Sequence, residues 1–188
     1  MSQDPRAMRP KDVKPMATRK AFGLALKDLG DKDDKVLVFD ADLSKSTQSG
    51  IFAEAHPERF YEMGIAEANM IGTAAGAALS GYKPFVCSFA AFIAGRFDQI
   101  KMSVAYSQAG VRIVGTHAGV GIGPDGYSQQ GLEDLACMRS LPTMLVLQEA
   151  YKTHTHADKD VEVLGHEWGL LFCFFKDLIK IFVLTNNT

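Results

Sequence analysis

Short apolar runs alternate with segments of helical spacing along most of this chain. The runs expected to form strands are residues 36–39, 60–63, 83–88, 111–115 and 143–147. The segments expected to form helices are residues 17–29, 67–79, 92–108 and 130–140. Repeated alternation of strand and helix is typical of a parallel sheet, because each parallel connection must cross over the sheet. We therefore predict an α/β fold with a parallel sheet flanked by helices on both faces.

Candidate functional residues follow successive predicted strands. Asp42, Glu67, Phe89 and His117 each come at or shortly after the end of one of these runs. In open parallel sheets, ligands bind beyond the carboxyl ends of the strands. We therefore expect these four side chains to share one edge of the sheet.

Glu67 lies in an unusually apolar stretch of sequence, GIAEANM, with no cation within several residues. A carboxyl group in such surroundings is suited to exchange a proton with a bound molecule near neutral pH. The alternative is an exposed glutamate in the first turn of a helix, where the helix dipole favours a negative charge.

The composition fits one globular domain and argues against a nucleic-acid partner. The chain has 188 residues, a formal net charge of −2 and 47% hydrophobic residues, which is enough for one domain with a substantial core. Binding to nucleic acid would require a basic stripe, which a chain of near-neutral charge does not predict.

The cysteines and the terminal segments favour a cytoplasmic protein that does not enter a membrane. Cys87, Cys137 and Cys173 are far apart in sequence and match neither a paired metal motif nor a small disulfide framework. Residues 1–16 are polar and are expected to form a flexible N-terminal arm, without the apolar core of a signal peptide. Charges interrupt the apolar segment at 169–184, so no run reaches the roughly 20 apolar residues that span a bilayer.

Three motifs occur in order along the chain. They are GIAEANM at residues 64–70, SFAAFIAGRFDQIKM at 88–102 and GTHAGVGIGPDGYSQQGLEDLACMRSLPTM at 115–144. Together they resemble the pyrimidine-binding domain of the transketolase family, across residues 17–150. The resemblance implies an enzyme that uses thiamine diphosphate to transfer two-carbon ketol units between sugar phosphates, as in the pentose phosphate pathway.

The resemblance also implies which residues hold the cofactor. Glu67 matches a catalytic glutamate that hydrogen-bonds a ring nitrogen of the aminopyrimidine and tunes its proton. Phe89 and Phe92 match the aromatic wall against that ring, although two phenylalanines three residues apart are also typical of a core, and this alternative stays open for Phe92. Asp42 matches an aspartate near the cofactor and the partner subunit, with a solvated acidic turn as the alternative.

The long third motif implies the substrate-binding residues. His117 matches a catalytic histidine beside the sugar, where a neutral imidazole can donate to or accept from a hydroxyl. Asp125 and Gln129 match residues that contact substrate hydroxyls. Tyr127 stands where the family usually has proline, so a bulky phenol in this loop is expected to reshape the substrate channel.

Two neighbouring positions bear on phosphate recognition and on the choice between relatives. Gly95 stands where mammalian relatives carry an arginine for the sugar phosphate, and Arg96 beside it is expected to point elsewhere on a helix. His117 separates this chain from deoxyxylulose-phosphate synthase, a cousin that typically has arginine at this place.

The chain lacks the family's diphosphate motif, which is Gly-Asp-Gly followed after a spacer by Asn-Asn. In the family that motif holds the cofactor's diphosphate through a metal ion. We therefore expect thiamine diphosphate to lie at an interface with a diphosphate-binding transketolase subunit, which would hold Mg²⁺ or Ca²⁺, and no metal site in this chain. The assembly would be a homo- or hetero-oligomer, and this chain, as a subunit or fragment of a split transketolase, would be inactive alone.

Residues 151–188 do not resemble the family and are expected to form a divergent C-terminal tail. Within it, residues 178–184 are expected either to act as a closing strand or to belong to an unrelated C-terminus. Two other functions remain open from the sequence. One is an enzyme like deoxyxylulose-phosphate synthase, and the other is a non-catalytic interaction or regulatory protein derived from this domain.

Overall fold

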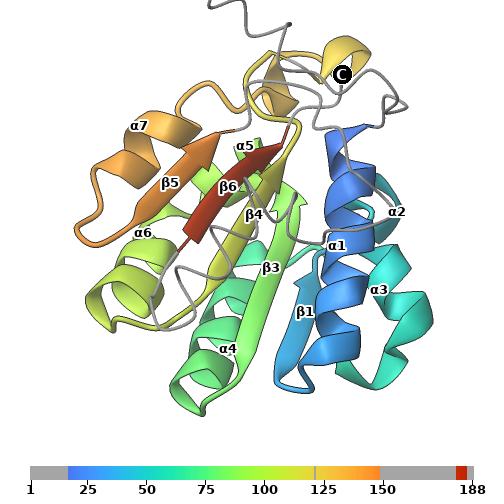
Figure 1. The fold of residues 1–188 in the computed structure, drawn as a ribbon. Helices are drawn as coiled ribbons and strands as arrows, with labels where there is room; N and C mark the ends of the chain where they lie inside the picture. Colours follow the sequence, from blue (N-terminus) through green and yellow to red (C-terminus); the bar gives the residue numbers. More distant parts are fainter. Residues whose placement is uncertain (1–16, 121, 149–180, 186–188) are drawn as a thin grey trace, which may run out of the picture.

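The computed structural model describes residues 17–120, 122–148 and 181–185 (Figure 1). The strands are β1 (Val36–Asp40), β2 (Phe60–Glu62), β3 (Lys83–Phe89), β4 (Arg112–Thr116), β5 (Leu145–Gln148) and β6 (Ile181–Thr185). The helices are α1 (Thr18–Lys32), α2 (Ser44–Thr47), α3 (Gly50–Ala55), α4 (Glu67–Leu79), α5 (Ala90–Ala94), α6 (Phe97–Gln99) and α7 (Asp134–Arg139). Three short 3-10 turns, η2 (Pro57–Arg59), η4 (Gly123–Asp125) and η5 (Tyr127–Gln129), and the π-helix η3 (Ile100–Tyr106) complete the described part.

The strands form one six-stranded sheet in the order β2-β1-β3-β4-β6-β5. Every pair of neighbours is parallel, which confirms the predicted parallel sheet. Asp40, the last residue of β1, pairs with Glu62, the last residue of β2, and with Cys87, two residues before the end of β3. Phe89, the last residue of β3, pairs with Thr116, the last residue of β4.

Helices cover both faces of the sheet, as the alternation predicts (Figure 1). Successive strand residues point to opposite faces, and the core is accordingly divided into two clusters. Leu37, Phe39 and Val86 pack with α4, α5 and η3 on one face. Val38 and Phe85 pack with α1 and α3 on the other.

The helix expected over residues 92–108 is wrong, because the chain there breaks into α5, α6 and the π-helix η3. The break falls at Gly95 and Arg96, where Arg96 leaves the helical region with φ −113° and ψ 32°. Glycine is a poor helix former, and the sequence pattern alone did not show that this one interrupts the helix.

The helix expected over residues 130–140 is also shorter in the structure, beginning only at Asp134. Gly131 instead forms bridges with Ala118 and Gly119, just after β4. A side chain at Gly131 would lie 3.1 Å from the Cβ of Ala90 and 3.2 Å from the amide nitrogen of Ala91. The bridges hold Gly131 against the loop after β4, and its close approach to α5 leaves no room for a side chain there.

The strand expected at residues 178–184 is observed as β6, which inserts between β4 and β5. A strand is present, as the first of the two alternatives requires, but it lies inside the sheet and β5 forms the edge. The N-terminal arm at 1–16 and the rest of the tail at 151–188 lie outside the described residues, so both remain predictions.

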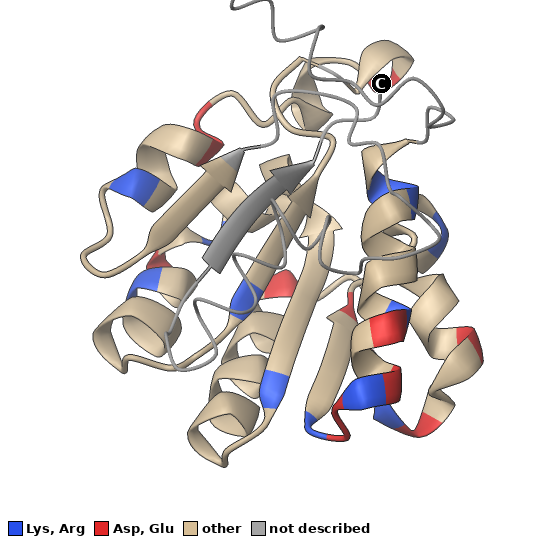
Figure 2. Ribbon diagram, viewed as in Figure 1, with Lys and Arg blue, Asp and Glu red and all other residues tan. Residues whose placement is uncertain are grey.

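Charged residues of both signs gather on α1 and near the amino ends of the strands (Figure 2). This view shows no continuous basic stripe over the described part. None of the helices in the described ranges combines the length and the apolar character that crossing a bilayer requires.

Candidate active site

The four candidate residues lie at the carboxyl edge of the sheet, as predicted. Asp42 follows β1, Glu67 opens the helix after β2, Phe89 ends β3 and His117 follows β4. These strands are neighbours in the sheet, so residues far apart in the sequence come to one edge.

An aromatic cluster forms the centre of this edge. The Phe89 and Phe92 rings are stacked, with centroids 5.5 Å apart and planes 19° apart. The His117 ring lies against Phe89 at 4.2 Å with a tilt of 50°. Phe89 and His117 are buried, whereas Phe92 is half-buried, so the cluster presents the edge of an aromatic wall to the outside.

His117 is held in an unusual backbone conformation directly after β4. Its φ is 56°, in the left-handed region that few non-glycine residues adopt. Its Nδ1 lies 2.9 Å from the Thr116 hydroxyl, which in turn donates weakly to the Ser88 carbonyl at 3.4 Å. In the tautomer with the proton on Nδ1, the ring donates to the Thr116 hydroxyl and Nε2 is a hydrogen-bond acceptor.

The surroundings keep the His117 imidazole neutral. Burial lowers its pKa from 6.5 to about 4, the positive charge of Arg19 adds to the shift, and Asp125 opposes it. Arg19 lies in the first turn of α1, which begins beside the carboxyl edge (Figure 1). Arg19 was not predicted from the sequence, because nothing in the local sequence connects α1 with the loop after β4.

Glu67 is the first residue of α4 and is only 5% exposed. Both interpretations of Glu67 require a helix start, but the burial excludes the exposed glutamate of the alternative. Among the residues that the structure describes, none hydrogen-bonds its carboxylate. A buried carboxylate without a partner is costly, which makes Glu67 a candidate to bind a ligand.

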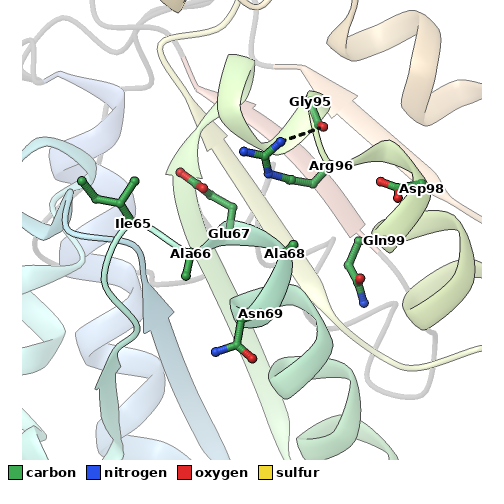
Figure 3. A pocket seen from close by; sticks show the side chains of 9 residues that line it. All are labelled: Ile65, Ala66, Glu67, Ala68, Asn69, Gly95, Arg96, Asp98 and Gln99. Atoms are coloured by element: carbon green, nitrogen blue, oxygen red, sulfur yellow. Dashed lines mark hydrogen bonds between the residues drawn. The ribbon is translucent and has the colours of Figure 1, made fainter.

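Glu67 lines a pocket of about 470 Å³ between the start of α4 and the α5–α6 connection (Figure 3). The lining residues are Ile65, Ala66, Glu67, Ala68, Asn69, Gly95, Arg96, Asp98 and Gln99. The Arg96 guanidinium points toward Glu67 across this pocket (Figure 3). Its expected position elsewhere on a helix is wrong, because the helix breaks at Gly95 and turns Arg96 into the pocket.

Asp42 lies in an exposed loop with φ 61°. Its backbone amide donates to Oε1 of Glu62 at 2.7 Å, and among the described residues no hydrogen bond joins its carboxylate to the aromatic cluster. Just before it, the buried Asp40 carboxylate accepts hydrogen bonds from Ser49 at 2.7 Å and Thr47 at 2.8 Å. Burial raises the pKa of Asp40, and these hydrogen bonds oppose the shift.

Asp125 and Gln129 lie in the two short 3-10 turns after β4. Asp125 is exposed, yet close enough to His117 for its charge to affect the pKa of the imidazole. Gln129 is half-buried, and its backbone amide donates to the Gly126 carbonyl at 3.1 Å. The structure therefore connects Asp125 with His117, and it shows no side-chain contact from Gln129 to the rest of the described site.

The described residues fit a flat heterocycle better than a metal ion. A stacked aromatic pair suits the face of a ring, and the carboxyl group of Glu67 is free to bond a ring nitrogen. Within residues 17–120, 122–148 and 181–185, no three His, Cys, Asp or Glu side chains converge to hold a metal.

Comparison with known proteins identifies the family to which this domain belongs. The family model of the transketolase pyrimidine-binding domain matches residues 14–157. The chain belongs to the transketolase family. Membership implies thiamine diphosphate as the cofactor, and the pyrimidine-binding domain is the part of the family that this chain contains.

Two curated relatives illustrate the match. The chain is 48% identical over 138 residues to a putative transketolase C-terminal section of Methanocaldococcus jannaschii, covering 73% of this chain and 44% of the relative. It is 44% identical over 173 residues to human transketolase, covering 92% of this chain and 27% of the relative. The chain therefore spans less than half the length of either relative.

Solved transketolase structures are similar in fold to this chain. A split-gene transketolase, described as an inactive beta4 tetramer, matches with a TM-score of 0.73 and 39% identity, covering 93% of this chain and 53% of the other. Transketolase from Campylobacter jejuni matches with a TM-score of 0.77 at 22% identity, covering all of this chain and 28% of the other. The second match shows that the fold of the pyrimidine-binding domain is shared.

Proposed function

We propose that this chain supplies the pyrimidine-binding half of a transketolase-like enzyme, which transfers two-carbon ketol units between sugar phosphates. Thiamine diphosphate would lie between this chain and a diphosphate-binding partner chain that holds Mg²⁺ or Ca²⁺, and the complex would work in the cytoplasm. The observation that carries the proposal is Glu67, a buried carboxylate without a described partner at the carboxyl edge of a pyrimidine-binding domain.

Each residue of the edge has a distinct task in this proposal. When bound, the cofactor supplies a carbon nucleophile that attacks the ketose carbonyl. Glu67 shares a proton with a nitrogen of the aminopyrimidine, because a buried carboxyl group without another partner gains most from that bond. Phe89 and Phe92 pack against the ring and exclude water, which strengthens the hydrogen bond to Glu67.

The loop after β4 would bind the sugar. His117 is neutral at pH 7, so Nε2 can accept a proton from a substrate hydroxyl and return it. Asp125 and Gln129 would accept hydrogen bonds from other hydroxyls. Arg19, whose charge already reaches His117, is the cation that we propose to face the sugar phosphate in place of the arginine missing at Gly95.

The relatives support a partner chain. The Methanocaldococcus protein is described as a C-terminal section, and the split-gene structure as an inactive tetramer of β chains. By analogy, this chain alone would form an oligomer without activity. We expect the diphosphate-binding partner chain to carry Gly-Asp-Gly with a downstream Asn-Asn.

The test is reconstitution of ketol transfer. The chain is mixed with the diphosphate-binding chain, thiamine diphosphate and Mg²⁺, and transfer from a ketose phosphate to an aldose phosphate is followed. We expect Glu67→Gln to lower kcat by about a hundredfold or more, since it removes an acid–base group. Glu54→Gln, at an exposed position on α3, is the matched control and should leave kcat unchanged.

Several outcomes would count against the proposal. Full ketol transfer by Glu67→Gln would exclude the role assigned to Glu67. Decarboxylation of pyruvate without ketol transfer would favour an enzyme like deoxyxylulose-phosphate synthase. Failure of thiamine diphosphate to bind even in the presence of the partner would favour a non-catalytic protein.

A further inference from the structure

Glu62 lies where two loops of the site meet. It is the last residue of β2, the edge strand, and it pairs in register with Asp40 at the end of β1. The pairing continues one step further, because the Met63 amide donates to the Asp40 carbonyl at 2.9 Å. The loop that carries Asp42 and the loop that leads to Glu67 therefore leave the sheet side by side.

The Glu62 carboxylate joins these two loops. Its Oε1 accepts hydrogen bonds from the Asp42 amide at 2.7 Å and from the Gly64 amide at 3.2 Å. Both donor residues adopt left-handed backbone conformations, with φ 61° at Asp42 and φ 66° at Gly64. Asp42 in this region is strained by about 1 kcal/mol, and a charge-assisted bond to its amide offsets that strain.

Two backbone hydrogen bonds link this junction to the first turn of α4, which begins at Glu67. The Ala66 amide donates to the Gly64 carbonyl at 2.7 Å, and the Met70 amide donates to the Ala66 carbonyl at 2.9 Å in the first turn of α4. Gly64 is thus linked to the start of α4 by consecutive bonds. A displacement of Gly64 would move the backbone that carries Glu67.

The Asp42 loop has a second, independent support on its other side. The Leu43 amide donates to Oδ1 of Asp40 at 2.7 Å, and Thr47 and Ser49 donate to Oδ2. Asp40 is fully buried, whereas Glu62 is exposed. Loss of the Glu62 carboxylate should therefore separate the Asp42 loop from the loop at Gly64 without unfolding the carboxyl end of β1.

We propose that Glu62 is a positioning residue, which holds the Asp42 loop and the Glu67 loop in a fixed relation through its two backbone hydrogen bonds. Its catalytic consequence rests on the function proposed above, because Glu67 must be held against the aminopyrimidine. The hydrogen bonds themselves belong to this chain and can be tested without a partner.

The first experiment measures amide hydrogen exchange by NMR on the full chain alone. Glu62→Ala should speed exchange at the Asp42 and Gly64 amides by about tenfold, as expected for loss of a bond to a charged acceptor. Glu62→Gln keeps an acceptor oxygen of the same reach and should restore much of the protection. Glu54→Ala, at an exposed glutamate of α3, is the control and should leave both amides unchanged.

The second experiment measures kinetics of the reconstituted complex. Glu62→Ala should lower kcat for ketol transfer by about tenfold with KM for the sugar phosphates nearly unchanged, since it displaces a proton-transfer group and not a sugar contact. Glu62→Gln should recover most of kcat, which a general loss of folding would not allow.

The two experiments separate the ways in which the ideas can fail. Unchanged exchange at Asp42 and Gly64 in Glu62→Ala would overturn the positioning role. Faster exchange with an unchanged kcat would show that the junction does not position Glu67, and would overturn it as well. Absence of ketol transfer in the unsubstituted complex would instead contradict the proposed function, and the exchange data would then decide the junction by themselves.

Discussion

The neutral state of His117 predicts a specific pH dependence of stability. Its imidazole has a pKa of about 4 in the folded chain, against 6.5 as the ordinary value. In the unfolded chain this residue therefore binds a proton below pH 6.5, whereas in the folded chain it stays neutral until about pH 4. The contribution of His117 to stability is complete above pH 6.5 and is lost progressively as the pH falls toward 4.

The size of the effect follows from the shift. A difference from 6.5 to about 4, at about 1.4 kcal/mol for each pKa unit, gives a loss of at most ~3 kcal/mol. The side chain is only 4% exposed, so solvent screens this contribution little. Carboxylates also titrate in this pH range, so a comparison with a variant is needed to isolate the contribution of His117 to the free energy of unfolding.

The assay is urea unfolding of the chain at pH values from 7.5 to 4.5, with the His117→Asn variant in parallel. Asparagine tolerates the left-handed φ of 56° at this position. The variant loses packing at every pH, which is a constant offset, but it has no imidazole to protonate. The free energy of unfolding of the unsubstituted chain should therefore fall more steeply below pH 6.5 than that of the variant.

A second variant tests the cause of the shift. Arg19→Gln removes a positive charge that lowers the pKa of His117, so it should raise that pKa and shrink the difference between the two unfolding curves. NMR titration of the His117 ring, assigned by its absence in His117→Asn, measures the pKa directly. Titration near 6.5, or identical pH dependence in the unsubstituted chain and His117→Asn, would refute the reasoning.

The remaining predictions concern the aromatic wall and helix packing. Phe92→Ala should raise the Kd for thiamine diphosphate in the reconstituted complex about fivefold, because one stacked ring contributes about 1 kcal/mol, whereas Tyr82→Ala, at the exposed position just before β3, should not. An unchanged Kd in calorimetry would assign Phe92 to the core alone. Gly30→Ala would place a Cβ 2.5 Å from the Phe52 ring and 2.8 Å from the His56 ring, and should destabilise the chain by about 1–3 kcal/mol. Gly76→Ala, with nothing within 4 Å, should be neutral or stabilising in the same urea experiment; equal effects at both sites would contradict the packing argument.

Glu67 shows how much of the site can be predicted from the residues that neighbour it in sequence. The stretch GIAEANM suggested a carboxylate in apolar surroundings, and Glu67 is indeed buried at the start of α4. The sequence could not show that Arg96 faces it. The direction of the Arg96 side chain depends on a helix break at Gly95, and glycine within an apolar pattern is compatible with both a continuous and a broken helix.

Residues 44–59 show a second limit of the pattern. No helix is predicted there from the sequence, yet α2 and α3 form and pack against α1. Both helices are short, and they depend on tertiary contacts such as Phe52 in the core cluster with Phe22 and Leu26. A helix of one or two turns has little stability of its own, so its periodic signal in the sequence is weak.

The sequence by itself determined the fold class, the family and the edge of the sheet on which the site lies. These follow from the period of apolar residues and from the motifs, which are local properties of the chain. The tertiary structure alone decided the order of strands, the insertion of β6 between β4 and β5, the proximity of Arg19 to His117 and the junction at Glu62. Each of these depends on contacts between residues distant in sequence, and both burial and electrostatic shifts exist only once those residues are brought together.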